Sequence, residues 1–243
     1  MHNLDHISAS QLSLFKECPR KWAYVQQFGR ERASVDMLAG SYFHAWAAEK
    51  LLYDGYSTCP LSAEDLAGFS DDEKIEAIER ARGFLGTWEK YAYASVRPIM
   101  NYDKPLVECQ DRFSIPNLDV PIELRVDLVD RDWGVVDWKT TSMYDPAKNW
   151  ERYNPPQASI QSYVYCLWYL TQIDPYAVTA PFLFCVIPNK GKPFTVNATK
   201  SVDEVAWFVR NELAPLVEMM QNGPYPAWGT HCDTCSFNTQ CRT

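Results

Sequence analysis

The sequence lacks an excess of basic residues. Its 23 lysines and arginines are outnumbered by 31 aspartates and glutamates, which gives a net charge of −8 at pH 7. Proteins that coat nucleic acid without sequence preference depend on a basic surface that displaces counterions from the phosphates. The overall charge therefore disfavours a nonspecific nucleic-acid coat. An enzyme that approaches nucleic acid through a local basic strip and a metal ion is still compatible with it.

The sequence also lacks long apolar runs and targeting signals. The longest apolar stretches, YVYCLWYL and PFLFCVI, fall far short of the roughly 20 residues of a membrane helix. The opening MHNLDHISAS has no basic start followed by an apolar core, so no secretory signal is expected. We therefore expect a cytoplasmic protein of a prokaryote or phage-infected cell. There, the eight cysteines would be metal ligands and buried thiols rather than disulfides.

Internal repeats, low-complexity tracts and flexible linkers are absent as well. A chain of 243 residues is long enough for one substantial core. We predict a single domain, residues 1–243, with three parts. These are a helical part over residues 1–100, a strand-rich core over 101–200 and a C-terminal helix with a cysteine group over 201–243.

Apolar periodicity predicts the elements of this domain. Alternating apolar residues predict three antiparallel strands at 106–115, 121–130 and 135–139 and a fourth strand at 180–187. Helical spacing predicts helices at 11–17, 20–28, 40–53, 71–94 and 156–171. Ser10 is the expected N-cap of the first helix, and Ser201 with Glu204 forms a capping box for a last helix that ends near residue 221. The order predicts an α/β sandwich with a mixed sheet.

Two charged side chains interrupt the apolar segment VVDWKTTS, residues 135–142. Side chains of a strand alternate between its faces, so Asp137 and Lys139 point to one face. If the preceding turn is centred on residue 132, Asp127 lies directly across from Asp137. Like charges at that distance are destabilising, and a bound Mg²⁺ would relieve the repulsion. The alternative is a solvated strand face on which Lys139 pairs with one aspartate.

A second group of metal-ligand residues ends the chain. The segment HCDTCSFNTQC places Cys232, Cys235 and Cys241 within ten residues, and Cys18, next to a proline, is the best candidate for a fourth ligand. Four thiolates hold either zinc or an iron–sulfur cluster, and spacing alone does not decide between them. The four remaining cysteines are interpreted as ordinary small apolar residues: Cys59, Cys109, Cys166 and Cys185.

Together these motifs resemble the PD-(D/E)XK nuclease superfamily. Its core is an Asp followed about ten residues later by Asp-x-Lys, as in Asp127 to Lys139, and VVDWKTT resembles its RecB-like branch. ISASQLSLFKECPRKW, GSYFH and QSYVY match further motifs of that branch in order. Leu124 replaces a glycine that the family often has, and Gln157 is an alternative to Gln161 for the glutamine of QSYVY.

The resemblance implies a restriction-endonuclease-like fold and a metal-dependent DNA nuclease. Mg²⁺ or Mn²⁺ would polarise the scissile phosphate and activate a water molecule, and Lys139 would position that water and offset charge in the transition state. Gln161 and Tyr165 would orient the lysine or the DNA backbone. The implied metal ligands are His44, Asp127, Asp137, the backbone carbonyl of Trp138 and, as a second-metal or water ligand, Glu108.

The cysteine layout resembles that of the iron–sulfur members of this branch, the CRISPR-associated Cas-four-type exonucleases and the AddB-type helicase–nuclease subunits. The resemblance implies a [4Fe–4S] cluster on the four cysteines named above, and zinc is the alternative. Such a cluster would tie residue 18 to residue 232 across a long loop, where closure entropy is largest.

The iron–sulfur relatives mostly degrade single-stranded DNA from an end, so a single-strand exonuclease is expected. The chain has no phosphate-binding loop of the Gly-x-x-x-x-Gly-Lys type, so a helicase, recombinase or CRISPR integrase partner would be a separate chain. Two rival hypotheses are a noncatalytic DNA-end-binding or assembly subunit and a zinc-clipped scaffold. The candidate DNA-binding strip, whose alternative is a solvated helix face, consists of Lys16, Arg20, Lys21, Arg30 and Arg32.

Overall fold

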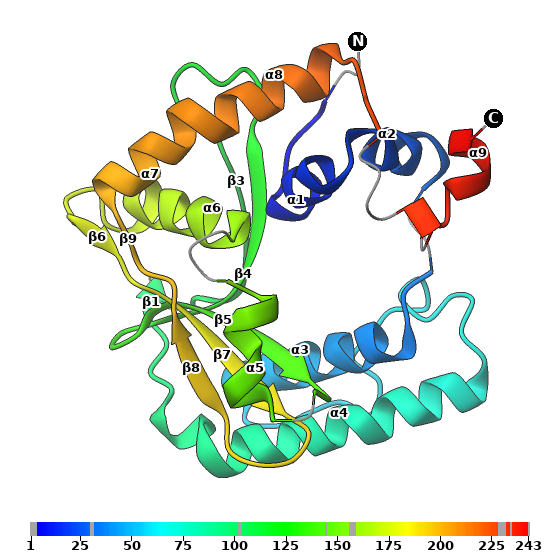
Figure 1. Cartoon of the computed structure of the whole chain (residues 1–243). Coiled ribbons are helices and arrows are strands. Elements are labelled where there is room, and N and C mark those ends of the chain that lie inside the picture. The colour runs from blue at the N-terminus through cyan, green and yellow to red at the C-terminus, as the bar shows by residue number, and fades with distance from the viewer. Residues whose placement is uncertain are drawn as a thin grey trace.

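A five-stranded mixed sheet forms the centre of the protein, with helices on both of its faces (Figure 1). The structure is a computed structural model that describes residues 4–29, 32–101, 104–143, 145–155, 159–227, 232–233 and 235–242, without the side chains of 151–153 and 242. Neighbouring strands are antiparallel except for the parallel pair β5 and β7. In sheet order the strands are β3 (Val107–Phe113), β4 (Ile122–Asp130), β5 (Gly134–Thr141), β7 (Phe182–Pro188) and β8 (Phe194–Asn197). The predicted α/β class with a mixed central sheet is confirmed.

The hairpin of β4 and β5 has the predicted register over its first three pairs. Asp130 pairs with Gly134, and the two pairs beyond it keep the same sum of residue numbers, ending at Leu128 and Val136. The buried carboxylate of Asp130 fixes the turn by accepting hydrogen bonds from the amides of residues 132 and 133, at 2.9 and 3.1 Å. Gly134 has a left-handed backbone, φ +74°, where β5 begins beside Pro181.

The prediction that Asp127 lies directly opposite Asp137 stays a prediction. Among the described strand residues, the pairs of β4 and β5 keep the predicted register and end one position earlier. Beyond that pair, the Asp127 carboxylate accepts a hydrogen bond from the amide of Trp138 at 2.7 Å. A side chain thus acts as the acceptor next to the end of the ladder.

The alternation of side chains also breaks at this point in β3 and β4. Val126 packs in the core on one face of the sheet, whereas Leu128, two residues on, packs in the core on the other face. Val107 in β3 likewise lies in the opposite core from Phe113. The sequence predicts one face for each of these pairs. Since a one-residue irregularity exchanges the faces of a strand, β3 and β4 must both be irregular between their paired ends.

Two helical layers cover the sheet. One core contains residues of β5 and β7 packed against α3 (Val35–Tyr53) and α4 (Asp71–Tyr91). The other core, on the opposite face, contains residues of α1 (Ala9–Glu17), α6 (Ile160–Trp168), α7 (Val202–Phe208) and α8 (Ala214–Asn222). Figure 1 shows the sheet between these layers. Val136 and Trp138 pack toward α3 and α4, as the strand alternation predicts.

Helix ends follow the capping residues, with one correction. Ser8, not the predicted Ser10, is the N-cap of α1, and its hydroxyl accepts a hydrogen bond from the amide of Gln11 at 3.3 Å. The predicted capping box of Ser201 and Glu204 is confirmed at α7.

Several elements lie outside the predicted set. α6 continues as a π-helical turn, Tyr169–Ile173, and a second such turn, Val209–Leu213, joins α7 to α8. The predicted start of α6 falls at residues 156–158, which lie outside the described residues. Besides β8, the additional elements are α5 (Pro146–Tyr153), α9 (Asn238–Arg242), a 3-10 turn (Tyr93–Ser95) and the short strands β1 (Met100–Asn101), β2 (Lys104–Pro105), β6 (Thr179–Ala180) and β9 (Lys200–Ser201).

The C-terminal segment packs against α2 (Pro19–Phe28), so residues distant in sequence meet (Figure 1). The Tyr24 hydroxyl donates to the carbonyl of Gln240 at 3.2 Å, and its ring lies 5.4 Å from that of Phe237. The Arg20 guanidinium donates to the carbonyl of Tyr225 at 3.2 Å. None of the helices in the described residues has the length and apolar character of a membrane span.

Candidate metal centre

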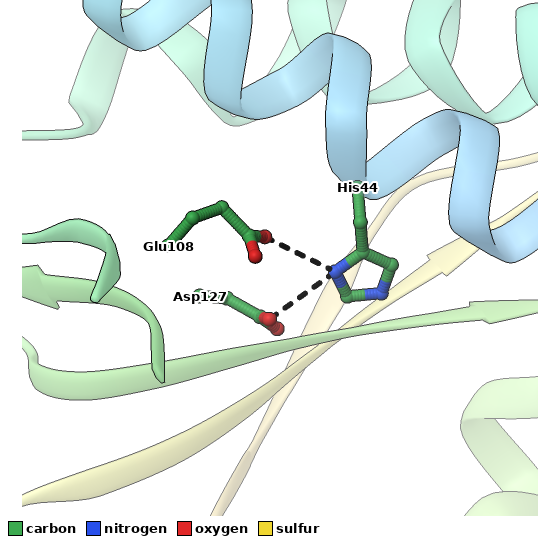
Figure 2. A group of neighbouring side chains, drawn as sticks. All are labelled: His44, Glu108 and Asp127. Carbon is green, nitrogen blue, oxygen red and sulfur yellow. Dashed lines mark ion pairs between the residues drawn. The ribbon is translucent and has the colours of Figure 1, made fainter. Parts of the chain in front are cut away.

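Three side chains from separate elements converge on one point beneath α3. The His44 Nδ1 atom lies 3.2 Å from a carboxylate oxygen of Asp127 and 3.9 Å from one of Glu108 (Figure 2). One ligand atom from each residue falls within 4.8 Å of the other two. Carboxylate oxygens and an imidazole nitrogen at these separations suit a divalent cation such as Mg²⁺ or Mn²⁺.

The chemistry of the donor set suits a metal ion. His44 Nδ1 is shielded from solvent and faces carboxylate oxygens of Asp127 and Glu108 without a hydrogen bond of good geometry among the described residues. A buried polar group without such a bond costs free energy that a ligand can recover. An imidazole nitrogen and two carboxylates placed in this way therefore fit a bound metal ion.

Close packing of α3 on the sheet positions His44. Gly40 lies so near β5 that a Cβ atom there would be 3.3 Å from the Thr140 hydroxyl. One turn further along the helix, the Phe43 ring makes edge contacts with the rings of Phe84 and Trp88. These contacts fix the helix axis and rotation, so His44 projects toward Glu108 of β3 and Asp127 of β4 (Figure 2).

Glu108 reaches the group through an unusual backbone conformation. Its φ of +47° is left-handed, which strains a residue that carries a Cβ atom, and such strain collects at functional sites. Glu108 and Asp127 occupy the positions at which β3 and β4 lose their regular alternation. The remaining Glu108 oxygen pairs with the Arg125 Nε atom at 3.1 Å.

Asp137, Lys139 and Gln161 form a closed triangle beside the metal group. The Lys139 Nζ atom lies 2.7 Å from Asp137 Oδ2 and donates to Gln161 Oε1 at 3.0 Å. The Gln161 amide in turn donates to Asp137 Oδ1 at 2.5 Å. The predicted juxtaposition of Lys139, Asp137 and Gln161 is thus present, whereas Gln157 lies outside the described residues.

Two further predicted residues have structural contacts in the same region. The Tyr165 hydroxyl donates to the backbone carbonyl of Arg125 at 2.7 Å and so supports β4 rather than contacting the lysine. Trp138 donates its amide to Asp127 and buries its indole among the residues beneath α4. The carbonyl of Trp138 as a metal ligand stays a prediction.

Burial and mutual repulsion shift the pKa values of the carboxylic acids. Burial, reinforced by the Asp127 charge, raises the pKa of Glu108 to about 7. Burial also raises the pKa of Asp137, although Lys139 opposes this shift. Burial likewise acts to raise the pKa of Asp127, but the neighbouring His44 outweighs it, so this pKa is lowered.

The same carboxylates raise the pKa values of the two basic groups. Burial acts to lower the pKa of Lys139, but Asp137 outweighs it and the pKa rises. The pKa of His44 rises for the same reason, with Asp127 as the dominant partner. The pKa values of Glu108 and Asp137 are thus raised in this buried site, and a bound divalent cation would favour their ionised forms.

The site opens into a cleft of about 640 Å³ between α1, α3, β4, β5 and α6. His44, Asp127, Lys139 and Gln161 line the cleft, together with Ser10 of α1 and Met37 of α3. Arg125 also lines the cleft with 67% of its side chain exposed. We did not predict Arg125 as a site residue. Its position two residues before Asp127 in β4, on the same predicted face, was the signal in the sequence.

The predicted DNA-binding strip does not form one free basic surface among the described residues. Lys16 pairs with Glu212 at 2.7 Å, and Lys21 pairs with Glu17 at 3.4 Å. Arg20 contacts the C-terminal segment, as described above, and Arg30 lies outside the described residues. Arg32 forms a two-pronged contact with the Glu73 carboxylate. The role of these five residues in DNA binding stays a prediction.

The four cysteines of the predicted cluster line one small pocket between α2 and the C-terminal segment. The Cys18 sulfur accepts a hydrogen bond from the amide of Lys21 at 3.4 Å, and Arg20 donates to the Cys241 sulfur at 3.9 Å. In the described chain, no three of the four sulfurs lie within 4.8 Å of one another. Of the other cysteines, Cys166 and Cys185 are buried as predicted, but Cys59 is exposed and is not a core residue.

Comparison with known proteins gives one family and a related fold. Residues 6–242 match the model of the PD-(D/E)XK nuclease superfamily. No curated protein matches the sequence. The structure resembles that of a putative exonuclease from Eubacterium rectale, with a TM-score of 0.58 and 12% identity over 96% of this chain and 88% of that chain. The protein SSO0001, at 14% identity over 99% of this chain and 88% of its own, has a TM-score of 0.42, which is too low to bear on the fold.

Proposed function

The chain belongs to the PD-(D/E)XK nuclease superfamily, and from that premise we propose that it is a metal-dependent exonuclease that hydrolyses single-stranded DNA from an end. One observation carries the proposal. A His44, Glu108 and Asp127 group lies beside the cleft, next to an Asp137–Lys139 pair. A cation site and a fixed amine within reach of one phosphate can together hydrolyse a phosphodiester.

Each residue of the site has a distinct proposed role. His44, Asp127, Asp137 and the Trp138 carbonyl would hold Mg²⁺ or Mn²⁺, and Glu108 would hold a second metal ion or its water. The bound metal would polarise the scissile phosphate and lower the pKa of a water molecule. Lys139, fixed by Asp137 and Gln161, would direct that water and stabilise negative charge on the phosphate oxygens.

We also propose that Cys18, Cys232, Cys235 and Cys241 hold a [4Fe–4S] cluster. All four line one pocket, and two of their sulfurs already accept hydrogen bonds, as thiolates of such clusters do. Zinc, which four thiolates also hold, is the alternative.

The motifs GSYFH, VVDWKTT and QSYVY with the cysteine layout support a place in the RecB-like branch, near the Cas-four-type and AddB-type enzymes. A partner helicase, recombinase or CRISPR integrase would then be a separate chain. None of the eight cysteines, all of which lie among the described residues, forms a disulfide, which fits the cytoplasm that we propose as the compartment.

Cleavage of end-labelled DNA tests the proposal. Anaerobically purified protein would be incubated with linear single-stranded, linear double-stranded and circular single-stranded DNA, with Mg²⁺, Mn²⁺ or EDTA. We expect metal-dependent loss of the linear single strand and slow or no cutting of the circle. Lys139→Ala should lower the rate about 10²- to 10³-fold, whereas Lys192→Ala, at an exposed turn, should not change it.

The outcomes separate the proposed activity from its rivals. Cutting of circular DNA as fast as linear DNA would show an endonuclease. Metal-independent binding of DNA ends without cleavage would favour the noncatalytic end-binding subunit. Iron analysis and visible absorbance of the same preparation would separate an iron–sulfur cluster from zinc.

A further inference from the structure

A second cavity, of about 240 Å³, adjoins the proposed cleavage site. Lys139 and Gln161 line both this cavity and the main cleft, so the two spaces share the same wall. The cavity extends from there between β7, which contributes Phe184, and the end of α5, which contributes Trp150. A molecule that reaches Lys139 from the main cleft is therefore next to this second cavity, because the Lys139 side chain lines both.

The cavity has two fixed aromatic walls. Trp150 is 8% exposed and Phe184 is 5% exposed, and both belong to the core beneath α6. The Phe184 ring centre lies 5.7 Å from the Lys139 ammonium nitrogen. Because core packing holds both rings, they keep their positions without a ligand. Such preorganised aromatic surfaces bind flat unsaturated rings with little loss of side-chain entropy.

Polar groups with unused hydrogen-bonding capacity complete the cavity. Ser159 accepts a hydrogen bond from the amide of Ser162 at 3.4 Å, which leaves its hydroxyl hydrogen free to donate elsewhere. Asn154 donates its amide nitrogen to the carbonyl of Trp150 at 3.2 Å, which leaves its amide oxygen as an acceptor. Apolar rings flanked by one donor and one acceptor match the chemistry of a nucleobase, whose edge carries both kinds of group.

We propose that this cavity is a pocket for the base of a nucleotide next to the scissile phosphate. The inference rests on the proposed nuclease function, since it is a phosphate held at Lys139 that brings the attached nucleoside to the cavity. A base can enter only after leaving its stack and its partner strand, which costs least at an unpaired end. The pocket therefore selects single-stranded DNA, and it gives a structural reason for that preference.

Removal of the base tests the pocket independently of the metal centre. The substrates are an oligodeoxythymidylate and two versions in which the last two nucleotides at the 5′ or the 3′ end carry tetrahydrofuran in place of the base. We expect the abasic residues at one end to slow release of the terminal nucleotides about tenfold or more, in line with the contribution of a base–aromatic contact. Affinity for the same oligomers in Ca²⁺, measured by fluorescence anisotropy, should fall in parallel.

A variant that fills the pocket provides the matching protein change. Pro155 is an exposed residue at the rim, and Pro155→Trp places an indole over the cavity. Ala147→Trp adds the same side chain at an exposed position of α5 outside the cavity lining and serves as the control. Pro155→Trp should slow cleavage of the normal substrate but add little to the effect of the abasic one, because both changes remove the same contact.

The result that would contradict the base pocket differs from the result that would contradict the proposed function. If the wild type cleaves and binds abasic and normal ends equally, or if Pro155→Trp slows both substrates by the same factor, no base occupies the cavity. If the wild type neither cleaves nor binds single-stranded DNA, the proposed function fails and the pocket fails with it. Base-dependent binding in Ca²⁺ without any cleavage in Mg²⁺ would support the pocket and contradict the catalytic assignment.

Discussion

At the scale of single residues, the site depends on a few side chains held in unusual states. Glu108 has a left-handed backbone, and the Asp127 carboxylate replaces a backbone acceptor between β4 and β5. Neither state is favourable for an isolated strand. Both are maintained by the surrounding sheet and by α3, and both bring carboxylates to His44. The local irregularities of the sheet and the candidate metal centre therefore have a common origin.

The raised pKa of Glu108 predicts how metal affinity depends on pH. At pH values below its pKa of about 7, the Glu108 carboxyl is protonated in the metal-free protein. A metal ion must displace this proton to bind. Affinity for Mn²⁺ should therefore rise with pH through about 7, and loss of the proton from His44, whose pKa is also raised, acts in the same direction. Isothermal titration calorimetry at several pH values between 5.5 and 8 would measure this dependence.

The matched variant is Glu108→Gln, which removes the titrating group but keeps the size of the side chain. It should bind Mn²⁺ more weakly at pH 8 and should show a flatter pH profile than the wild type. Glu89→Gln, on the surface of α4 and paired with the Tyr56 hydroxyl, is a control that should leave the profile unchanged. A profile that is equally steep in Glu108→Gln would remove Glu108 from the metal site.

At the scale of secondary-structure elements, the hairpin of β4 and β5 positions the two strands that carry Asp127, Asp137 and Lys139. Its turn depends on the buried Asp130 carboxylate and on Gly134. Because β5 runs parallel to β7 and antiparallel to β4, its start must pass close to the chain that enters β7. Gly134 lies at this crossing beside Pro181.

Gly134→Ala should destabilise the protein by about 2–4 kcal/mol, because it adds a side chain where the backbone is left-handed and crowded. The new Cβ atom would lie 2.3 Å from the Pro181 ring and 2.5 Å from its carbonyl oxygen. Urea denaturation measures the free energy of unfolding. Gly191→Ala is the control, since its φ of +106° carries backbone strain but the space around it is open. Equal losses for both variants would show that the crossing is not tightly packed.

The sequence predicts this part of the fold well because the relevant rules are local. Alternating residues specify β4 and β5, and the turn residues set a register that is confirmed from Asp130 to Leu128. The paired ladder ends before Asp127, whose side chain accepts a hydrogen bond from the amide of Trp138. Such a bond depends on neighbouring strands and on burial, and neither can be read from the alternation of residues.

Other features were unpredictable for a related reason. The conformation of Glu108 and the exposure of Arg125 are set by contacts between elements far apart in sequence. The π-helical turns after Trp168 and Phe208 are short. Over such a length their apolar residues are spaced as in an α-helix, so the sequence pattern does not distinguish the two. By contrast, Asp137, Lys139 and Gln161 were predicted together, since a resemblance over several ordered motifs constrains positions that periodicity leaves open.

At the scale of the whole molecule, the C-terminal segment closes the chain onto its N-terminal helices. It contacts α2 through Tyr24, Arg20 and the pocket of four cysteines. These contacts involve few residues compared with the two cores that cover the two faces of the sheet. A covalently held cluster would therefore contribute much of the free energy that keeps this segment in place.

Cys235→Ser should lose most of its iron and visible absorbance and should expose the C-terminal segment to proteolysis. Limited trypsin digestion followed by mass spectrometry would locate the cuts, which we expect after the basic residues nearest the two ends. Cys59→Ser, at an exposed cysteine outside the pocket, should keep its iron and its resistance. A Cys235→Ser protein with the same iron content and the same digestion pattern as the wild type would contradict a cluster at these cysteines.

The most direct test of the central claim is the rate at which Asp137→Asn hydrolyses linear single-stranded DNA. Asp137 touches both Lys139 and Gln161, so the neutral amide removes the charge that fixes the lysine and weakens a proposed metal ligand while keeping the side-chain shape. The measurement is nucleotide release at saturating Mn²⁺, with Glu79→Gln on the exposed face of α4 as the control. We predict a fall of at least about 10²-fold for Asp137→Asn and no change for the control. A rate for Asp137→Asn within twofold of the wild type would show that hydrolysis does not take place at this site.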